Sequence, residues 1–587
     1  MEAIQFSDRS TWVSTLNFNH MKNFKQYIIL ALFGFQVAMA ITSCKKVETE
    51  PRDWIQADLV WDDQDKNGTV AGFFLNSVYN YIPSGFNRID GDFLDAASGD
   101  AIPSRNNTQV EYFTNGRIST LNNPDPYWGN SYYGIRAANI FLANINVVPI
   151  AALTKQYWRA EARYIRALLY FELLKRYGGV PLIGNKVFTL EDNLELPRNS
   201  FADCINYIIS ECDAVKDSLR LETGANYTTS DWGRIPKGAA IALKCRAYLY
   251  AASPLYNGGG VESNGTLKVL TGYPTADASR WQKVIDAAVE LNALNYYQLQ
   301  PVFNNVFLTN KNTEVILSKQ AAVNTGIETT NAPSGYGAPA LSNGRTSPTA
   351  DLVNAFTMRN GLPITDAASG YNPAAPYTNR DLRLDYTIFY NGVNWLNRGV
   401  QTYEGGLDKP GGTTVQTRTG YYLRKFMGNF ATNSTYTNQS HNFIIFRYAE
   451  IILNYAEALN EVGRTEDAVK QIILLRTRAG ITAGANTRYG IPVGISQESM
   501  RTLIMNERRV ELAFEEHRFW DIRRWKIAPA VLSGALNGTK ITKNANNTFT
   551  YENIPVVTSI FTNKLYHMPV PYAETTKNSQ LLQNEGW

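Results

Sequence analysis

The chain has 587 residues, of which 12% are aromatic and 18% charged, a charged share below the roughly 25% usual for soluble domains. This composition excludes an intrinsically disordered protein and leaves ample apolar side chains for a large core. The formal net charge is +4 without a long basic run, so no nucleic-acid partner is expected, because phosphate binding needs concentrated positive charge. Only four His and four Cys are present, and we expect neither a metal site nor a cofactor.

An export signal is predicted near the N-terminus. Lys22 and Lys25 precede an apolar stretch, residues 27–41, that is too short for a comfortable membrane span. Residues 1–20 carry no targeting pattern, so we expect translation to begin at Met21. No later stretch reaches about 18 consecutive apolar residues, so no membrane-spanning segment is expected in the mature chain.

The signal ends in a lipoprotein pattern. In the segment ITSC an aliphatic residue and two small residues stand directly before Cys44, the arrangement that lipoprotein signal peptidase cleaves. The alternative is an ordinary signal followed by a coincidental cysteine. We predict a signal peptide over residues 1–43, a flexible lead over 44–60 that is lipidated at Cys44, and a single domain over 61–587.

Helical periodicity dominates several later segments. In residues 154–177 apolar side chains recur at spacings of three and four, and two glycines and a proline close the segment. The next helix is expected to begin at Ser200, with Asp203 as its partner in a capping box. Further helices are predicted at residues 236–252, 278–292, 447–462, 465–479 and 497–516.

The clearest pair of helices lies in residues 447–480. Small residues where two helices approach, and a glycine at the turn, are typical of the tetratricopeptide repeat of about 34 residues. The other pairs fit less well, so the sequence predicts a mainly α fold built from degenerate tetratricopeptide-like hairpins. Two stretches, residues 85–130 and 305–445, are long, polar and aromatic without a helical period, and we expect functional loops or small sheets there.

The densest cluster of charge lies in residues 507–525. On a continuous helix, Glu507, Glu511 and Glu515 would fall on one line, which is compatible with a carboxylate metal site or an acid–base pair. We favour a structural network with the neighbouring arginines, because arginine is abundant and the E-x-x-H pair of a helical di-metal site is missing. The expected members of this network are Glu507, Arg508, Glu511, Arg518, Asp521 and Arg524.

Four segments resemble signature motifs of the SusD/RagB family. They are EARYIRALLYFELLKRYGGVPLI (161–183), FRYAEIILNYAEALNEVG (446–463), IMNERRVELAFEEHRFWDIRRW (504–525) and KLYHMPVPYAETTKNSQLLQNEGW (564–587). The resemblance also includes NRDLRLDYTIFYNG (379–392), and it runs from about residue 60 to the C-terminus. Glu516 is a departure, since many members have glycine there, and we expect it to alter a contact at the helix end.

The resemblance implies a SusD-like superhelix of four tetratricopeptide-like units with minor β structure and a loop-rich ligand face. Its N-terminal part would cover about residues 61–230 and its C-terminal part about 300–587. It further implies a non-enzymatic lipoprotein, anchored in the outer membrane and facing the cell surface. Such proteins capture oligosaccharides, or in some branches peptides, and deliver them to a SusC/RagA-like TonB-dependent transporter barrel.

Sugar capture requires aromatic faces for stacking and polar side chains for hydroxyl groups. The candidates in the first loop stretch are Asp90, Asp92, Arg105, Asn106, Asn107 and Tyr112, and those in the second are Tyr336, Tyr390, Asn394 and Trp395. We expect Tyr336 and Trp395 to be exposed, so that truncating either leaves the fold intact. The alternative is that each aromatic ring packs its own loop, and Trp128 is expected to be a core anchor.

Two other classes of function stay open at this point. A surface glycoside hydrolase needs two carboxylates across a cleft, and Asp90 with Asp95 is a possible pair. An assembly scaffold would instead hold a protein segment in the groove of the helical repeats.

Overall fold

The computed structural model describes residues 57–337, 342–429 and 436–587. Trp61–Trp587 form one compact unit, and Met1–Val60 form another, of which the short helix α2 (Ala57–Val60) is described. The predicted start at Met21, the signal peptide and Cys44 lie outside the described residues. Within the described ranges, no helix combines the length and the apolar character needed to cross a bilayer.

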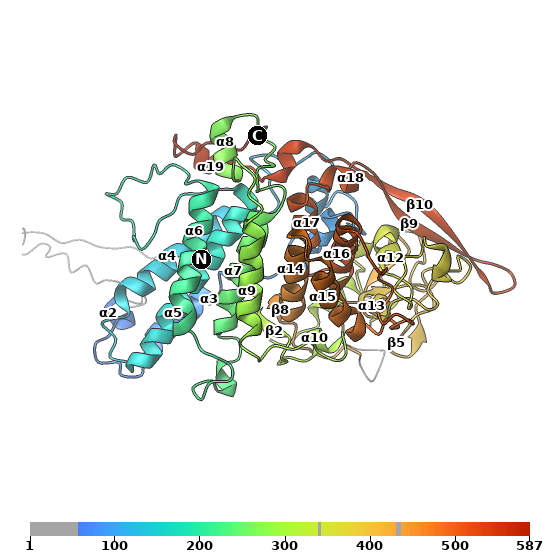
Figure 1. The fold of residues 1–587 in the computed structure, drawn as a ribbon, viewed down its shortest axis with the longest axis horizontal. Coiled ribbons are helices and arrows are strands. Elements are labelled where there is room, and N and C mark those ends of the chain that lie inside the picture. The colour runs from blue at the N-terminus through green and yellow to red at the C-terminus, as the bar shows by residue number, and fades with distance from the viewer. Residues whose placement is uncertain (1–56, 338–341, 430–435) are drawn as a thin grey trace, which may run out of the picture. The chain divides into compact units, whose positions relative to one another are not determined.

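Helices are the main regular structure of the larger unit and strands are few, which confirms the predicted mainly α fold. The long ones are α3 (Thr69–Tyr79), α4 (Tyr127–Asn144), α5 (Ala152–Tyr177), α6 (Phe201–Val215), α7 (Lys237–Ala252), α9 (Arg280–Asn292), α14 (Tyr448–Glu461), α15 (Thr465–Arg478) and α16 (Gln497–Glu511). They pack in chain order from α4 to α7, then α9, then α14, which contacts both α15 and α16 (Figure 1).

The boundaries of these helices follow from local chemistry. The predicted capping box is present at α6, where Ser200 Oγ accepts a hydrogen bond from the Asp203 N–H at 3.0 Å. α5 ends at Gly178, whose φ of 78° favours glycine and whose added Cβ would lie 2.6 Å from the Leu270 carbonyl oxygen. Trp128 is 5% exposed on α4, in the core as expected.

The predicted helix over residues 497–516 is too long. α16 ends at Glu511, because Phe514 and Glu516 take positive φ angles of 62° and 60° and turn the chain before α17 (Arg518–Arg524). Glu515 therefore lies in the turn and does not continue the helical line of Glu507 and Glu511.

The two long loop stretches hold small antiparallel sheets, as expected. The pairs are β1 (Ala101–Pro103) with β3 (Thr346–Pro348), β2 (Val315–Lys319) with β8 (Phe443–Arg447), β4 (Ile388–Phe389) with β7 (Tyr422–Leu423), and β5 (Asn394–Trp395) with β6 (Arg398–Gly399). A hairpin of β9 (Gly534–Lys543) and β10 (Phe549–Ser559) was not predicted. Its strands carry many exposed polar residues and little apolar alternation, so the sequence gives a weak strand signal.

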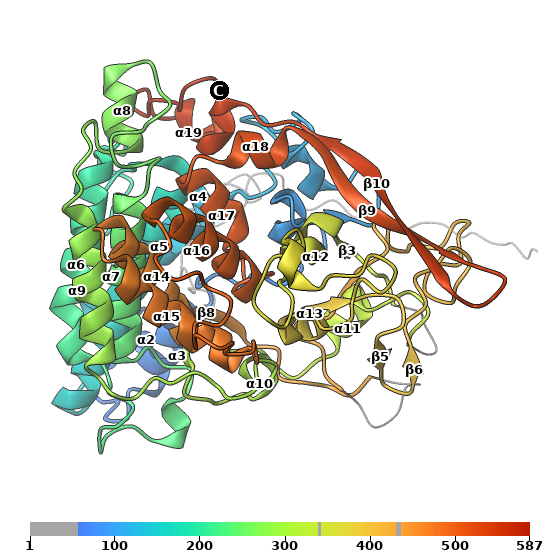
Figure 2. The same ribbon diagram turned by 45° about the vertical axis from the view of Figure 1, so that its right-hand side comes forward.

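Short helices connect these sheets to the helical side. They are α8 (Gly265–Thr271), α10 (Asn305–Leu308), α11 (Gly326–Asn331), α12 (Ala350–Ala355), α13 (Leu382–Thr387), α18 (Ala528–Leu532) and α19 (Tyr572–Thr575). Figure 2 shows α12, α13 and β5 on the side of α14–α17 that faces away from α6, α7 and α9, with the β9–β10 hairpin beside them. The loop-rich part of the chain is thus carried on one side of the helical array.

Candidate functional site

A pair of short strands brings two distant loop segments together. Pro103 of β1 pairs with Thr346 of β3, and the Ser104 N–H donates to the Arg345 carbonyl oxygen at 2.7 Å. Arg105 is the second residue after β1, and Arg345 directly precedes β3. Antiparallel pairing therefore places both arginines at the same end of this two-stranded sheet.

The two arginines meet at Asp90. Arg105 Nη2 donates to the Asp90 carbonyl oxygen at 3.2 Å and lies 3.6 Å from the Asp90 carboxylate. Arg345 Nη2 donates to the same carbonyl oxygen. The Arg105 and Asp90 side chains are 36% and 39% exposed. We call Asp90, Arg105 and Arg345 the arginine cluster.

The backbone under the arginine cluster has a conformation that favours glycine. Asp90 and Gly91 have φ angles of 53° and 84°. A Cβ at Gly91 would lie 2.4 Å from Arg345 Nη2, so the absence of a side chain lets the guanidinium rest against the main chain. Asn107 also has a positive φ, 60°, so the loop that carries Arg105 is shaped by a second left-handed residue.

Asp92 lies beneath the arginine cluster and is fully buried. One of its carboxyl oxygens accepts a hydrogen bond from Thr346 Oγ1 at 3.0 Å, and Oδ2 is buried without a partner. Burial raises the pKa of Asp92 to about 7, although the Thr346 hydrogen bond and the charges of Arg345 and Arg105 oppose the rise. Near neutral pH this carboxyl group therefore carries only part of a negative charge.

Both arginines keep unused hydrogen-bond donors. The Nε atoms of Arg105 and Arg345 are buried and have no hydrogen-bond partner among the described residues. Two guanidinium groups thus share one exposed carboxylate and one partly ionised carboxyl group. The cluster carries an excess of positive charge at a partly exposed position.

The remaining candidates of the first loop stretch differ in exposure. Asn106 and Asn107 are exposed directly after Arg105. Tyr112 is half-buried, and the Arg117 guanidinium lies 4.5 Å from the centre of its ring. That face of Tyr112 is therefore occupied by a side chain of the protein itself.

The prediction that Tyr336 and Trp395 are exposed is wrong. Each is 2% exposed, and their ring centres lie 4.9 Å apart. Trp395 Nε1 donates to the Gly428 carbonyl oxygen at 3.0 Å, and Tyr336 Oη donates to the Arg398 carbonyl oxygen at 3.0 Å. The two rings form a small core within the loops, because short sheets need buried aromatic area to hold together.

The other two candidates of the second stretch also differ. Tyr390 is half-buried, stacks on Tyr377 with ring centres 4.1 Å apart, and donates from Oη to Asp385 at 2.6 Å. Asn394 is exposed on β5.

Asp95 is not placed to act with Asp90 across a cleft. It is 1% exposed, and its Oδ1 accepts a hydrogen bond from the Phe514 N–H at 3.1 Å. Burial, followed by the nearby charges of Glu516 and Asp100, raises the pKa of Asp95 to about 8. The two-carboxylate arrangement of a glycoside hydrolase is therefore not formed by this pair.

The charged motif forms a buried network, and residues from outside the motif join it. Arg447 pairs with Glu314, Glu511 and Glu515 at 2.7, 2.8 and 2.6 Å. Glu511 ends α16 and Glu515 lies in the turn that follows, whereas Glu314 comes from a distant segment, so Arg447 ties this turn to another part of the chain.

Asp521 is the second centre of this network. Arg508 and Arg524, both expected members of the network, pair with Asp521 at 2.8 and 2.7 Å. Arg518 instead lies 3.6 Å from Asp100. Glu516, the departure noted in the sequence, accepts a hydrogen bond from Arg88.

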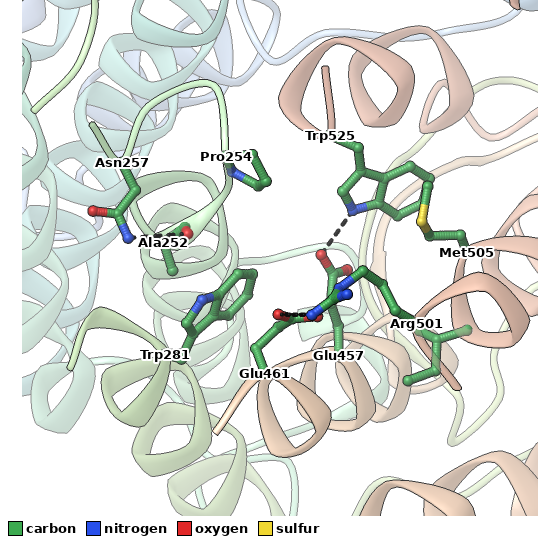
Figure 3. Close-up of a pocket in the computed structure, with 10 residues that line it drawn as sticks. Ala252, Pro254, Asn257, Trp281, Glu457, Glu461, Arg501, Met505 and Trp525 are labelled. Atoms are coloured by element: carbon green, nitrogen blue, oxygen red, sulfur yellow. Dashed lines mark hydrogen bonds and ion pairs between the residues drawn. The ribbon is translucent and has the colours of Figure 1, made fainter. Parts of the chain in front are cut away.

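A cavity of about 200 Å³ lies on the helical side, between the end of α7 with α9 and α14 with α16. Trp281 and Trp525 line it, and Trp525 Nε1 donates to Glu457 at 2.7 Å (Figure 3). Glu461 pairs with Arg501 at 2.6 Å. Glu457 also pairs with Arg524 at 2.6 Å, so the charged groups that line this cavity already have partners within the protein.

Sequence analysis did not identify Arg345. Its local context, an Asn-Gly turn before a short strand, is common in loops, and nothing in it indicates pairing with residues 101–103. Among the described residues, no group of three or more His, Cys, Asp or Glu side chains is arranged to hold a metal ion.

Known protein families match both halves of the chain. The family described as "SusD family" matches residues 313–587, and the one described as "Starch-binding associating with outer membrane" matches residues 74–249. SusD-like protein P2 of Formosa agariphila is 24% identical and aligns over 88% of this chain and 90% of its own.

Solved structures share the fold. A SusD-like protein from Bacteroides fragilis is 28% identical, with a TM-score of 0.75 over 91% of this chain and 99% of its own. A laminarin-binding SusD-like protein is 21% identical, with a TM-score of 0.62 over 89% of this chain and 100% of its own. The family matches and the shared fold together show that the chain belongs to the SusD family.

Proposed function

We propose that the protein is a cell-surface lipoprotein that captures an oligosaccharide and delivers it to a SusC/RagA-like TonB-dependent transporter barrel. The observation that carries this proposal is the partly exposed arginine cluster, flanked by Asn106 and Asn107, on the loops of a SusD-family chain. Guanidinium, carboxylate and amide groups are suited to sugar hydroxyls. The description "Starch-binding associating with outer membrane" and the laminarin-binding relative support a glycan ligand.

Binding without catalysis is the favoured mode. The carboxylate pair weighed for hydrolysis is split between a surface loop and the core, because Asp95 is buried. A glycan panel incubated with the purified protein should yield complexes and no cleavage products. Product release would favour a hydrolase, and binding of peptides in place of glycans would favour the peptide-capturing branch of the family.

The test of glycan capture uses the full chain with Cys44→Ala, purified without its lipid. A panel of neutral and acidic oligosaccharides should contain at least one ligand, measured by calorimetry. The double variant Arg105→Ala with Arg345→Ala should weaken that ligand's binding at least about tenfold, because hydrogen bonds to charged groups contribute about 1.5 to 3 kcal/mol each. No binding to any glycan would overturn the proposal.

The membrane anchor is part of the same proposal. Residues 1–43 would be the signal peptide, 44–60 the lead and 61–587 the ligand-binding domain. Since acylation needs the Cys44 thiol, Cys44→Ala should abolish lipid labelling and release the protein from membranes, whereas starting translation at Met21 should change nothing. Labelling that persists in the Cys44→Ala protein would rule out this site.

The transporter partner has its own test. Affinity purification of the full chain from detergent-solubilised outer membranes should recover a barrel of the TonB-dependent class. Recovery of the chain alone, under conditions that preserve other outer-membrane complexes, would contradict delivery to such a barrel.

A further inference from the structure

We propose that the arginine cluster recognises an acidic oligosaccharide, one that carries carboxylate or sulfate groups. This inference rests on the proposed glycan-binding function and names the chemical class of its ligand. Its basis is the pair of guanidinium groups of Arg105 and Arg345, which meet at a single backbone carbonyl group with donors left over.

The local charge balance favours an anion. Arg105, Arg345, Asp90 and Asp92 are close enough to influence one another electrostatically. The neighbouring pair of Arg418 and Glu111, 3.5 Å apart, adds no net charge. Burial keeps Asp92 protonated in part near neutral pH. The two arginines therefore face the full charge of Asp90 and only part of a charge on Asp92, which leaves a net positive charge.

The open donors have the geometry that anionic groups use. A guanidinium group binds carboxylate or sulfate through parallel N–H donors, and such charge-assisted hydrogen bonds are roughly twice as strong as neutral ones. The Asp90 carbonyl oxygen, which both Nη2 atoms contact, is a neutral acceptor. The Nε atoms are buried, so an anionic ligand group would reach these guanidinium groups through the Nη atoms of the partly exposed side chains.

The predicted platforms for a neutral sugar are fewer in the structure than the sequence suggests. Tyr336 and Trp395 are buried in the loop core, and Tyr390 and Tyr112 are covered on one face by Tyr377 and Arg117. Stacking is therefore blocked at Tyr336 and Trp395 and limited to one face at Tyr390 and Tyr112. In this part of the loop face, ionic contacts therefore offer a ligand more binding energy than aromatic stacking does.

The cluster is pre-organised for this task. Arg345 lies against Gly91, where an added Cβ would meet its guanidinium, and Asp90 is held in a left-handed conformation. Ordering two long side chains before the ligand arrives lowers the entropy cost of binding.

The experiment compares matched ligands by calorimetry with the Cys44→Ala protein. Two pairs are used: a uronate-containing oligosaccharide with its carboxyl-reduced form, and a sulfated oligosaccharide with its desulfated form. We expect at least one acidic member to bind about tenfold or more tightly than its neutral partner. Carboxyl reduction abolishes the preference if the ligand is a uronate, and desulfation abolishes it if the ligand is a sulfate ester.

Single substitutions test whether the arginine cluster causes the preference for the acidic oligosaccharide. Arg105→Ala and Arg345→Ala should each weaken the acidic ligand about 10- to 100-fold and a neutral one less than about twofold. Arg464→Ala is the matched control, because it removes the same charge from the exposed pair that Arg464 forms with Asp467 at 2.8 Å on the helical side. Equal melting temperatures of all variants would show that the losses are not caused by unfolding.

Two further measurements test the charge itself. Raising the salt from about 0.05 to 0.5 M should weaken the acidic ligand and leave the neutral one unchanged. Binding should also be tighter near pH 6 than near pH 8, because Asp92, with a pKa of about 7, ionises in between and repels an anion. Asp92→Asn should remove this pH dependence.

The outcomes separate this inference from the proposed function. Neutral oligosaccharides that bind as tightly as their acidic partners would overturn the acidic ligand and uphold glycan capture. Acidic binding that survives the double variant would remove the arginine cluster from the site. Failure of every glycan to bind would overturn both.

Discussion

Two of the regions in which arginine and carboxylate side chains meet differ sharply: the buried network around α16 and α17, and the arginine cluster at the end of β1 and β3. In the network Arg383 is 2% exposed and pairs with Asp381, Glu507 and Glu511 at 2.7, 2.7 and 2.9 Å. In the cluster two arginines share one carbonyl oxygen and one partly exposed carboxylate.

The difference is one of burial and partner number. A buried charge is tolerated only when opposite charges and hydrogen bonds compensate its lost hydration, so buried arginines such as Arg383 and Arg447 each pair with three carboxylates and serve the fold. A partly exposed charge keeps contact with water and needs no such compensation, which leaves it available to a ligand. Residue type alone does not distinguish the two roles.

The largest effect is expected at the centre of the network. Asp521 is 2% exposed and compensates both Arg508 and Arg524. Asp521→Ala should lower the free energy of unfolding by about 3 to 5 kcal/mol, because two buried cations lose their shared partner. Urea denaturation measures this loss, and glycan affinity of the folded protein should not change.

The control for this prediction is Asp467→Ala. Asp467 pairs with Arg464 at an exposed position on α15, where an ion pair contributes about 0 to 1 kcal/mol. If both variants lost the same free energy of unfolding, the distinction between buried charges with several partners and exposed charges would be contradicted.

The second prediction concerns the aromatic core next to the loop face. Trp395 packs on Tyr336 and Phe389, with ring centres 4.9 Å away in both cases. Trp395→Ala should cost about 3 kcal/mol of stability through the cavity and the lost hydrogen bond to Gly428. Its exposed neighbour serves as the control, since Asn394→Ala should leave the melting temperature unchanged. A Trp395→Ala protein that has normal stability but no glycan affinity would show instead that the Trp395 ring contacts the ligand.

The helical side of the fold was predictable because its signals are local. The Ser200 and Asp203 capping box and the glycine after α5 lie within a few residues of the helix ends that they determine. The turn after α16 was missed because Phe514 and Glu516 adopt positive φ without glycine, and that conformation depends on the burial of Phe514 and the ion pair of Glu516 with Arg88.

The loop face was predictable only in part. Asp90, Asp92 and Arg105 were identified because they are close in sequence, whereas Arg345 joins them through strands of three residues, too short for an alternation pattern. Burial of Trp395 and Tyr336 likewise depends on contacts between segments. Composition identified the types of side chain on the face but not which of them reach the surface.

The third prediction tests a carboxyl group that links the two regions. Asp95 lies on η1 (Leu94–Ala97), near Asp92, and binds the main chain of Phe514 beside the network. Its pKa is raised from 3.8 to about 8, so the stability that the neutral group provides is complete below about pH 4 and is lost as the pH rises to about 8. Asp95→Asn should therefore gain about 1 to 3 kcal/mol over the native protein at pH 8, with little difference near pH 4. Denaturation curves at several pH values measure this gap, and a gap independent of pH would show that Asp95 is ionised in the folded state.

The smallest effect on stability is expected in the arginine cluster. Arg105 is 36% exposed and 3.6 Å from the Asp90 carboxylate, a geometry in which an ion pair contributes about 0 to 1 kcal/mol. Its contact with the Asp90 carbonyl oxygen, at 3.2 Å, is also near the surface, where water replaces a lost donor. Arg105→Ala should therefore stay within about 1 kcal/mol of the native protein in urea denaturation, while the same substitution removes most of the affinity for an acidic glycan. A loss of stability comparable to that of Asp521→Ala would place Arg105 in the fold's own charge network, and the physical reason for assigning the cluster to a ligand would disappear.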